Sequence, residues 1–495
     1  MTGGAPSTAG ARRGEAHCVL MVCDFFFPSI GGVETHIWAL GQCLLRRGHR
    51  VVVLTHSFGG ARHGVRVLTN GLKVYHAPWV AAFQNCTLPT FFPLLPLLRE
   101  VVVREGVEVV HGHQDSSAMV HEALFHAQTL GLRTCFTSHS LFNVFDTASL
   151  HLNKVLRFSL SGADHVICVS HTCRENMAVR CGLAGERIST IPNAVDAASF
   201  TPDPSRRDRA PRLNVVVISR LAYRKGTDLV AQVVPLVCAR FPAVHFVIGG
   251  DGPKRLLLDE MCERYQLHDR VELLGSVPHT QVRDVLCRGQ IFLNCSLTEA
   301  FCMAILEAAS CGLFVVSTRV GGIPEVLPPD MVSFAAEPSA RAVADCLSRA
   351  IEVELALGAA GGARDVWAQH ARVRGMYDWK DVAERVERVY DAIRARPHNA
   401  SFAQRLYRCT EAGPIAGLLS MLLVAADALL LLLVQCLRPD TDIEPAPHID
   451  LNGIVKDGPA GLHEHEQPAA ASNHQHKQGH ATKHALSELN KLRRG

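Results

Sequence analysis

The sequence predicts an α/β protein in which two doubly wound domains are followed by one helix long enough to cross a membrane. Short continuous apolar runs alternate with amphipathic helical stretches, which is typical of parallel strands buried on both faces. This alternation stops at residues 191–212, which are rich in Pro, Asp and Arg, and it restarts at residue 213. Residues 414–437 are almost entirely apolar, and at about 1.5 Å per residue they exceed the roughly 30 Å hydrocarbon core of a bilayer.

The composition argues against nucleic-acid binding and predicts that the cysteines are reduced. The chain has 495 residues, enough for two to four domains, and a formal net charge of only +3 against 50 basic residues. A nucleic-acid-binding protein would carry an excess of basic residues on one face, so we expect no nucleic-acid partner. The 17 cysteines are scattered and form no C-x-x-C pair, so we expect a reducing compartment without disulfides or zinc.

The first domain is predicted over residues 17–208, after a disordered N-terminus at residues 1–16. Its first strand leads through a loop that contains Gly31 and Gly32 into an amphipathic helix, which Gly48 ends. Apolar runs predict its strands at residues 18–23, 50–54, 107–111, 134–137 and 165–169.

The second domain is predicted over residues 209–375 and repeats the alternation. Its strands are expected at residues 213–218, 245–248, 271–274, 291–295 and 313–317. An amphipathic helix within residues 376–396 closes the globular part. Two such domains in one chain place the natural active site in a crevice between them.

The C-terminal region is interpreted as a basic juxtamembrane linker (397–414), a membrane-spanning helix (415–437) and a disordered polar tail (438–495). Arg405 and Arg408 precede the helix, so the positive-inside rule places the globular domains in the cytosol and the tail on the lumenal side. A buried core helix is the alternative interpretation.

Asp427 lies near the middle of the predicted span. A carboxylate at this depth costs about 2.5–3.5 kcal/mol on insertion scales. We therefore expect Asp427 to face a membrane helix of another protein of the complex rather than lipid; the alternative is a protonated Asp that the bilayer simply tolerates.

Two glutamates mark the strand-to-helix crossover at residues 296–312. Glu299 stands just ahead of the predicted short helix, Glu307 about two turns into it, and Gly312 ends it. Carboxylates at such a crossover suit the binding of sugar hydroxyls, while the free N–H groups of the helix face an anion. The alternative is a helix cap and a solvated surface glutamate.

Cations and glycines occupy other strand ends. Arg220 and Lys225 follow the first strand of the second domain, where they could clamp a pyrophosphate without a metal ion. Gly31 and Gly32 allow close approach of a phosphate but do not form G-x-G-x-x-G, which weakens the case for a nicotinamide-dependent dehydrogenase. His139 follows a first-domain strand and faces the crevice, although a core histidine is the commoner case.

Taken together, these motifs resemble the family 4 retaining glycosyltransferases, which have the GT-B fold of two Rossmann-like domains facing a cleft. The resemblance covers residues 17–390 and rests on Arg220 and Lys225, the Glu299-x7-Glu307 spacing, residues 191–196 and the Gly31-Gly32 loop. The wording of residues 296–312, with a single C-terminal span, is similar to the phosphatidylinositol N-acetylglucosaminyltransferases that start glycosylphosphatidylinositol (GPI) anchor synthesis. Ala300 stands where the family usually has Gly, a small departure.

The resemblance implies retaining transfer of N-acetylglucosamine from UDP-N-acetylglucosamine to phosphatidylinositol, with the acceptor held by the first domain and the donor by the second. Arg220 and Lys225 would hold the diphosphate, with Gly31 and Gly32 in the donor site. Glu299 would orient the sugar, Glu307 would take the ribose hydroxyls, and His139 would lie beside the reacting centre.

The resemblance also implies that no metal or other cofactor is needed. It places the enzyme in the endoplasmic reticulum membrane, together with other membrane subunits. Residues 88–98, apolar and interrupted by proline, are expected to contact the membrane beside the acceptor cleft; a buried helix is an equal alternative. Two rival functions stay open, namely a transferase of the same fold with another nucleotide sugar, such as a mannosyltransferase, and a non-catalytic membrane scaffold.

Overall fold

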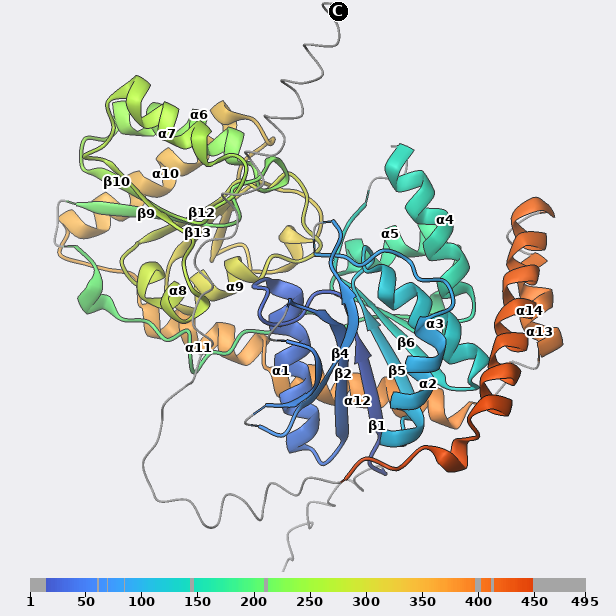
Figure 1. Ribbon diagram of the computed structural model, residues 1–495. Coiled ribbons are helices and arrows are strands. Elements are labelled where there is room, and N and C mark those ends of the chain that lie inside the picture. Colours follow the sequence, from blue (N-terminus) through green and yellow to red (C-terminus); the bar gives the residue numbers. More distant parts are fainter. Residues whose placement is uncertain are drawn as a thin grey trace, which may run out of the picture. The chain divides into compact units, whose positions relative to one another are not determined.

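The computed structural model contains two mainly parallel sheets, each with helices on its faces (Figure 1). It describes residues 15–59, 62–68, 70–83, 85–142, 147–208, 212–396, 402–410 and 414–447. The predicted disordered ends therefore lie almost entirely outside the described residues. Two doubly wound α/β domains in one chain confirm the predicted fold class.

The N-terminal domain is built on an eight-stranded sheet in the order β3-β4-β2-β1-β5-β6-β7-β8. The strands are β1 (Cys18–Val22), β2 (Arg50–Ser57), β3 (Gly64–Val67), β4 (Lys73–Val80), β5 (Val109–His113), β6 (Arg133–Ser138), β7 (His165–Cys168) and β8 (Ile188–Thr190). Of these strands, only β3 runs antiparallel to its neighbour, β4. The sequence analysis did not predict β3, β4 or β8, and all four residues of β3 are exposed.

Within the described residues, the helices that connect these strands are α1 (Gly32–Arg46), α2 (Leu94–Glu105), α3 (Ala118–Thr129), α4 (Thr147–Ser161) and α5 (His171–Cys181). The apolar segment at residues 88–98 is divided by the start of α2. Leu94, Leu95 and Leu98 are fully buried, whereas Leu88 and Phe91 are exposed. The leucines Leu94, Leu95 and Leu98 thus belong to the core, whereas Leu88, Phe91 and Pro96 are exposed.

The C-terminal domain is built on a six-stranded sheet in the order β11-β10-β9-β12-β13-β14. Its strands are β9 (Leu213–Ile218), β10 (Val244–Gly249), β11 (Val271–Gly275), β12 (Ile291–Asn294), β13 (Phe314–Ser317) and β14 (Val332–Phe334). Its helices are α6 (Thr227–Arg240), α7 (Arg255–Tyr265), α8 (His279–Leu286), α9 (Met303–Ser310), α10 (Ala340–Ala359) and α11 (Val366–Met376). The strand order reverses between β9 and β12, which is where such sheets bind ligands.

The closing helix α12 (Trp379–Ala395) returns to the N-terminal domain and packs beside α1 (Figure 1). Its Tyr390 is fully buried, and the Tyr390 hydroxyl lies 2.7 Å from Nδ1 of His111 on β5. The helix therefore completes the core beneath the N-terminal sheet.

Two further helices follow, α13 (Phe402–Cys409) and α14 (Pro414–Leu437), so the predicted linker at 397–414 contains a helix. Gly417–Leu437 is apolar and long enough to cross a membrane, which by itself is weak evidence that it does so. The helix α14 packs on α2 and α3 of the N-terminal domain.

Two expectations for this region are wrong. Asp427 does not face another protein, because it is fully buried against α3, where its Oδ1 lies 2.8 Å from Nδ1 of His126. Residues 438–447 are not the start of a disordered tail, because they contact the N-terminal domain and bury Ile443. Hydropathy alone could not reveal either contact, since both depend on side chains some 300 residues away.

Candidate active site

The reversal between β9 and β12 brings together two residues that are far apart in the sequence. Lys225 is the last residue of a short 3-10 helix, Tyr223–Lys225, that follows β9. Glu299 follows β12. The Lys225 ammonium donates a hydrogen bond to Oε1 of Glu299. Burial alone would lower the pKa of Lys225, but the Glu299 carboxylate outweighs it and raises that pKa. A lysine at this position is therefore charged.

Gly226 allows this approach. It has a φ of +72°, and a Cβ atom there would lie 1.8 Å from the carbonyl oxygen of Cys295, at the end of β12. The neighbouring Arg224 carbonyl accepts a hydrogen bond of 2.9 Å from the N–H of Leu297. The segment that carries Lys225 is thus pressed against the segment that carries Glu299.

Polar contacts fix the Glu299 side chain and backbone. Ser296 Oγ lies 3.0 Å from Glu299 Oε1 and 2.9 Å from Asn294 Oδ1, so its hydroxyl can donate to either. The carbonyl of Glu299 accepts a 2.9 Å hydrogen bond from the N–H of Gly322, and a Cβ atom at Gly321 would lie 2.1 Å from that carbonyl oxygen. The carboxylate is therefore held in place before any ligand arrives.

Glu307 lies on α9 and is buried, 3.4 Å from Nε2 of His279 at the start of α8. The hydrogen bond to Glu307 raises the pKa of His279 against the opposing effect of burial. The two sequence-predicted glutamates thus have different cationic partners, Lys225 and His279.

The glycine loop of the N-terminal domain lies next to this region. A Cβ atom at Gly32 would sit 3.7 Å from Cγ of Met303, the first residue of α9, whereas Gly31 has extended backbone. Glu34, in the first turn of α1, is buried. Its pKa is raised by burial, and the positive charge of the exposed Arg220 partly offsets that rise. Gly32 of the N-terminal domain therefore lies close to α9 of the C-terminal domain, and Arg220 of the C-terminal domain lies close to Glu34 of the N-terminal domain.

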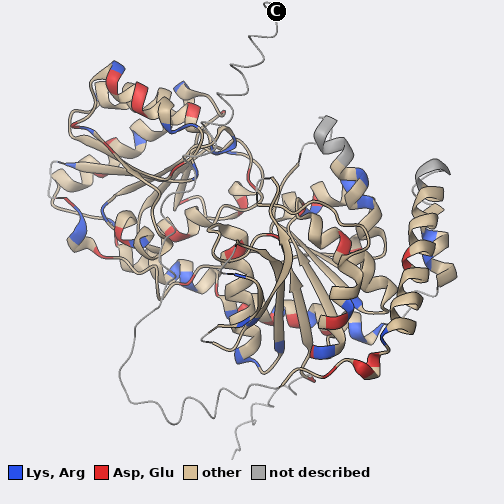
Figure 2. Ribbon diagram, in the orientation of Figure 1, with Lys and Arg blue, Asp and Glu red and all other residues tan. Residues whose placement is uncertain are grey.

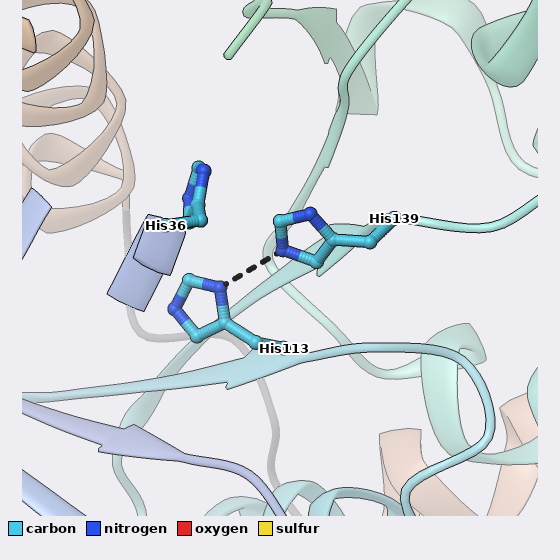
Figure 3. Close-up of side chains that lie close together, drawn as sticks. All are labelled: His36, His113 and His139. Atoms are coloured by element: carbon cyan, nitrogen blue, oxygen red, sulfur yellow. Dashed lines mark hydrogen bonds between the residues drawn. The ribbon is translucent and has the colours of Figure 1, made fainter. Parts of the chain in front are cut away.

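His139 lies in a cluster of histidines at the carboxyl end of the N-terminal sheet (Figure 3). Nε2 of His139 is 3.4 Å from Nδ1 of His113, and its ring packs edge-on against His36 with centroids 4.6 Å apart. His111 adds a fourth ring, 4.1 Å from that of His113. His36 and His113 come from α1 and β5, so three elements build the cluster.

Burial keeps this cluster uncharged. It lowers the pKa of His36 to about 4 and that of His111 to about 3, and it holds the pKa values of His113 and His139 well below the usual range. The ligand nitrogens of His36, His113 and His139 all lie within 4.8 Å of one another, and neutral imidazoles are what metal ions require. These three residues could therefore hold a metal ion, although the sequence predicts none.

Sequence reasoning missed His36, His111, His113, Glu34 and His279. Only His111-Gly-His113 left a signal, because two histidines of like orientation stand at the end of a predicted strand. The others lie inside helices, where nothing distinguishes them from ordinary helical residues.

Solved structures with the same fold are glycosyltransferases or related enzymes of low identity. Sucrose-phosphate synthase from Thermosynechococcus elongatus gives a TM-score of 0.63 at 20% identity, over 77% of this chain and 99% of that chain. Anabaena HepE in complex with UDP and glucose gives 0.59 at 16% identity, over 76% and 99%. Together they show the GT-B fold.

Family models and sequence relatives are more specific. Residues 56–146 match the PIGA (GPI anchor biosynthesis) model, and residues 212–352 match the glycosyl transferases group 1 model. A phosphatidylinositol N-acetylglucosaminyltransferase subunit of Arabidopsis thaliana is 52% identical over 88% of this chain and 94% of its own length. The human protein of the same name is 48% identical over 90% of each chain, and the gpi3 subunit of Schizosaccharomyces pombe is 50% identical over 86% of this chain and 91% of its own. The chain therefore belongs to the PIGA/GPI3 family of phosphatidylinositol N-acetylglucosaminyltransferase subunits and is a glycosyltransferase.

Proposed function

We propose that this chain is the catalytic subunit that transfers N-acetylglucosamine from UDP-N-acetylglucosamine to phosphatidylinositol with retention of configuration. The observation that carries the proposal is the Lys225–Glu299 pair at the β9–β12 reversal. A scaffold of the same fold would have no need for a charged lysine held against a preorganised carboxylate. The names of the relatives support this substrate pair and GPI-anchor biosynthesis.

Donor binding would rearrange this pair. A diphosphate offers Lys225 a second anionic partner, and Arg220 supplies the second positive charge. With Lys225 drawn toward the diphosphate, Glu299 is released to accept hydrogen bonds from sugar hydroxyls, and Glu307 is available to the ribose hydroxyls. Fixed cations that meet the charge developing on the leaving phosphate are the main source of rate enhancement in such a site.

Retention follows from attack on the face from which the diphosphate leaves. The bond between the anomeric carbon and the diphosphate oxygen breaks as the acceptor hydroxyl oxygen forms its bond to that carbon. The acceptor proton passes to the departing phosphate oxygen, so no side chain needs to act as general base. His139, neutral in its cluster, would donate or accept a hydrogen bond beside the reacting centre without adding charge.

The acceptor is a membrane lipid, so the enzyme works at a bilayer surface. We place it on the cytosolic face of the endoplasmic reticulum, in accord with the arginines that precede α14. The relatives are named as subunits, which supports assembly with other subunits. Basic and acidic residues are interspersed over the two sheet domains (Figure 2). A nucleic-acid-binding protein would gather its basic residues on one face, so this proposal includes no nucleic-acid partner.

Microsomes that lack the endogenous protein and express this chain with its partner subunits provide the test. Radiolabelled UDP-N-acetylglucosamine should label a lipid that phosphatidylinositol-specific phospholipase C cleaves, whereas UDP-glucose and GDP-mannose should not. Release of the label by an α-specific but not a β-specific N-acetylglucosaminidase would verify retention. Labelling from GDP-mannose, or undiminished labelling by Glu299→Ala, would refute the proposal.

A further inference from the structure

The loop after β6 of the N-terminal domain carries His139 and then contacts the C-terminal domain. Leu141, two residues after His139, packs against Gly321, where a Cβ atom would lie 2.7 Å from Cδ1 of Leu141. The same Cβ atom would lie 2.1 Å from the carbonyl oxygen of Glu299. Leu141 is therefore a point at which the loop that carries His139 meets the segment that carries Glu299.

Arg224 connects the same loop to the segment that carries Lys225. It directly precedes Lys225 in the 3-10 helix after β9. Nη2 of Arg224 donates a hydrogen bond of 3.2 Å to the carbonyl oxygen of Leu141. The guanidinium carbon of Arg224 also lies 5.7 Å from the centroid of the Phe142 ring, within the range of a cation–π interaction.

The loop is anchored in its own domain as well. Ser140 Oγ lies 2.9 Å from Oε1 of Gln114, and the Phe142 carbonyl accepts a 3.0 Å hydrogen bond from Nδ2 of Asn176 on α5. The buried Arg180 guanidinium lies 4.9 Å from the centroid of the Phe142 ring. Because both domains hold this loop, a contact with Arg224 fixes its position relative to Lys225.

Glu325 forms a second bridge between the domains. It is the last residue of the 3-10 helix Ile323–Glu325 in the C-terminal domain. Its carboxylate accepts hydrogen bonds from the N–H groups of His171 and Thr172, at 2.6 and 2.8 Å, and from the Thr172 hydroxyl at 2.7 Å. These are the first two residues of α5, where free N–H groups and the helix dipole favour a negative charge.

The backbone that leads to Glu325 is tied to Glu299. The N–H of Gly322 donates a 2.9 Å hydrogen bond to the Glu299 carbonyl. A Cβ atom at Gly322 would lie 2.6 Å from Oγ of Ser170, the N-cap residue of α5. The segment at residues 321–325 thus contacts Glu299 on one side and the N-terminal domain on the other.

Stability alone does not account for these two charged residues. The side chains of Arg224 and Glu325 are exposed and belong to neither core, and exposed polar contacts contribute little to the free energy of unfolding. Their partners nevertheless lie in the opposite domain, beside the proposed reacting groups. Neither sheet by itself sets the separation between His139 and the Lys225–Glu299 pair, so contacts across the two domains must set it.

We propose that Arg224 and Glu325 are positioning residues that hold His139 at a fixed separation from the Lys225–Glu299 pair. Arg224 acts through the loop after β6, and Glu325 acts through α5 and the Glu299 backbone. The inference rests on the proposed function, which places the reacting centre between His139 and Glu299. A displacement of about 1 Å in such a site can lower the rate about 10²-fold, so contacts that add little stability can still govern transfer.

The test compares Arg224→Ala and Glu325→Ala with the matched control Arg240→Ala, each in the full chain with its partner subunits. Arg240 is also exposed, lies 5.3 Å from the Phe241 ring centroid and pairs with Glu352, but all of these residues belong to the C-terminal domain. Each test variant should lower kcat about tenfold and change the KM for UDP-N-acetylglucosamine less than twofold, because the donor is held by other residues. Arg240→Ala should change neither constant. An unchanged kcat, or a loss that a raised KM accounts for, would overturn the proposal for that residue.

Conservative variants separate positioning from folding. Arg224→Lys keeps a donor for the Leu141 carbonyl and should restore most of the parent kcat, and Glu325→Gln keeps one acceptor oxygen and should lose less than Glu325→Ala. The Tm of each alanine variant should stay within about 2 °C of that of the parent. A lower Tm in step with the lost kcat, without rescue by Arg224→Lys, would assign these residues to folding and overturn the proposal. If the parent chain uses a donor other than UDP-N-acetylglucosamine, only the proposed function fails, and the same variants are compared with that donor.

Discussion

The carboxyl ends of the two sheets differ in the charge of their side chains. At the C-terminal sheet, the charged edge pairs cations with carboxylates, namely Lys225 with Glu299 and His279 with Glu307. At the N-terminal sheet, the histidine cluster (His36, His111, His113 and His139) is uncharged, and all of its members except the partly exposed His139 are buried. One fold, repeated in one chain, has thus produced a charged half-site and a neutral half-site.

This contrast matches what each half is proposed to bind. A nucleoside diphosphate brings at least two negative charges, so its site needs cations whose own partners can be displaced. The hydroxyl group of an acceptor brings no charge, and a neutral imidazole can hydrogen-bond to it without attracting the diphosphate to the wrong side. We therefore expect transfer to require positive charge at the C-terminal edge and neutral side chains at the N-terminal edge.

The largest effect is expected from Lys225→Ala. In the proposed donor site, loss of the Lys225 ammonium removes a preorganised cation from the leaving group, so kcat/KM should fall about 10²–10³-fold in the microsomal assay. Because Glu299 would lose its partner, the double variant Lys225→Ala/Glu299→Gln should be less impaired than the product of the two single effects. If the loss in the double variant instead equals the product of the two single losses, Lys225 and Glu299 do not act as a unit.

The charged edge could largely be predicted from sequence, and the histidine cluster could not. Lys225 and Glu299 each follow an apolar strand, and carboxyl ends of parallel strands meet at one edge, so their proximity follows from topology. His36 lies within α1, and its position beside His139 depends on how that helix packs on the sheet. No periodicity in the chain records that packing.

The C-terminal helix shows a different limit. Hydropathy correctly identified an apolar helix at 414–437, but it treats every residue of a helix alike. Asp427 could be a destabilising charge in lipid or a buried partner of His126. The contact with α3 decides between these, and only the three-dimensional structure shows that contact. The same holds for Asp440 and Arg99, which turn a predicted tail into part of the domain.

A smaller effect, on stability as well as activity, is expected from Gly226→Ala. Its added Cβ would meet the Cys295 carbonyl oxygen at 1.8 Å, which must push Lys225 away from Glu299. We expect a loss of about 3 kcal/mol in the free energy of unfolding, seen as a lower Tm of the full chain. Gly361→Ala is the matched control, since Gly361 has a φ of +71° with nothing within 4 Å, and it should cost only about 1 kcal/mol. Equal losses would show that backbone conformation, not the contact with β12, makes Gly226 necessary.

The histidine cluster should give stability a steep dependence on pH. Since the folded-state pKa of His36 is about 4 and that of His111 about 3, against about 6.5 unfolded, the unfolded chain binds more protons between these values. The free energy of unfolding should therefore fall with pH below about 6.5, by about 1.4 kcal/mol per pH unit for each histidine. His279 has the opposite effect on stability. Its pKa is raised in the folded state, so it contributes stability at low pH that is lost as the pH rises through that pKa. His36→Asn, which keeps a polar atom facing Asn193, should flatten the acid side, whereas the exposed His268→Asn should not.

The smallest effect, and the sharpest test of neutrality, is expected from a chelator. If His36, His113 and His139 held a metal ion, the N-terminal edge would be charged after all, and the contrast between the two edges would disappear. If the Lys225 ammonium and the Arg220 guanidinium hold the diphosphate as proposed, they supply the positive charge that it requires, and removal of metal should change transfer by less than about twofold. Dialysis of the solubilised complex against EDTA, with the metal content measured before and after, checks this. A loss of activity that zinc or manganese restores, and that His113→Gln abolishes, would instead assign a resident metal to the histidine cluster.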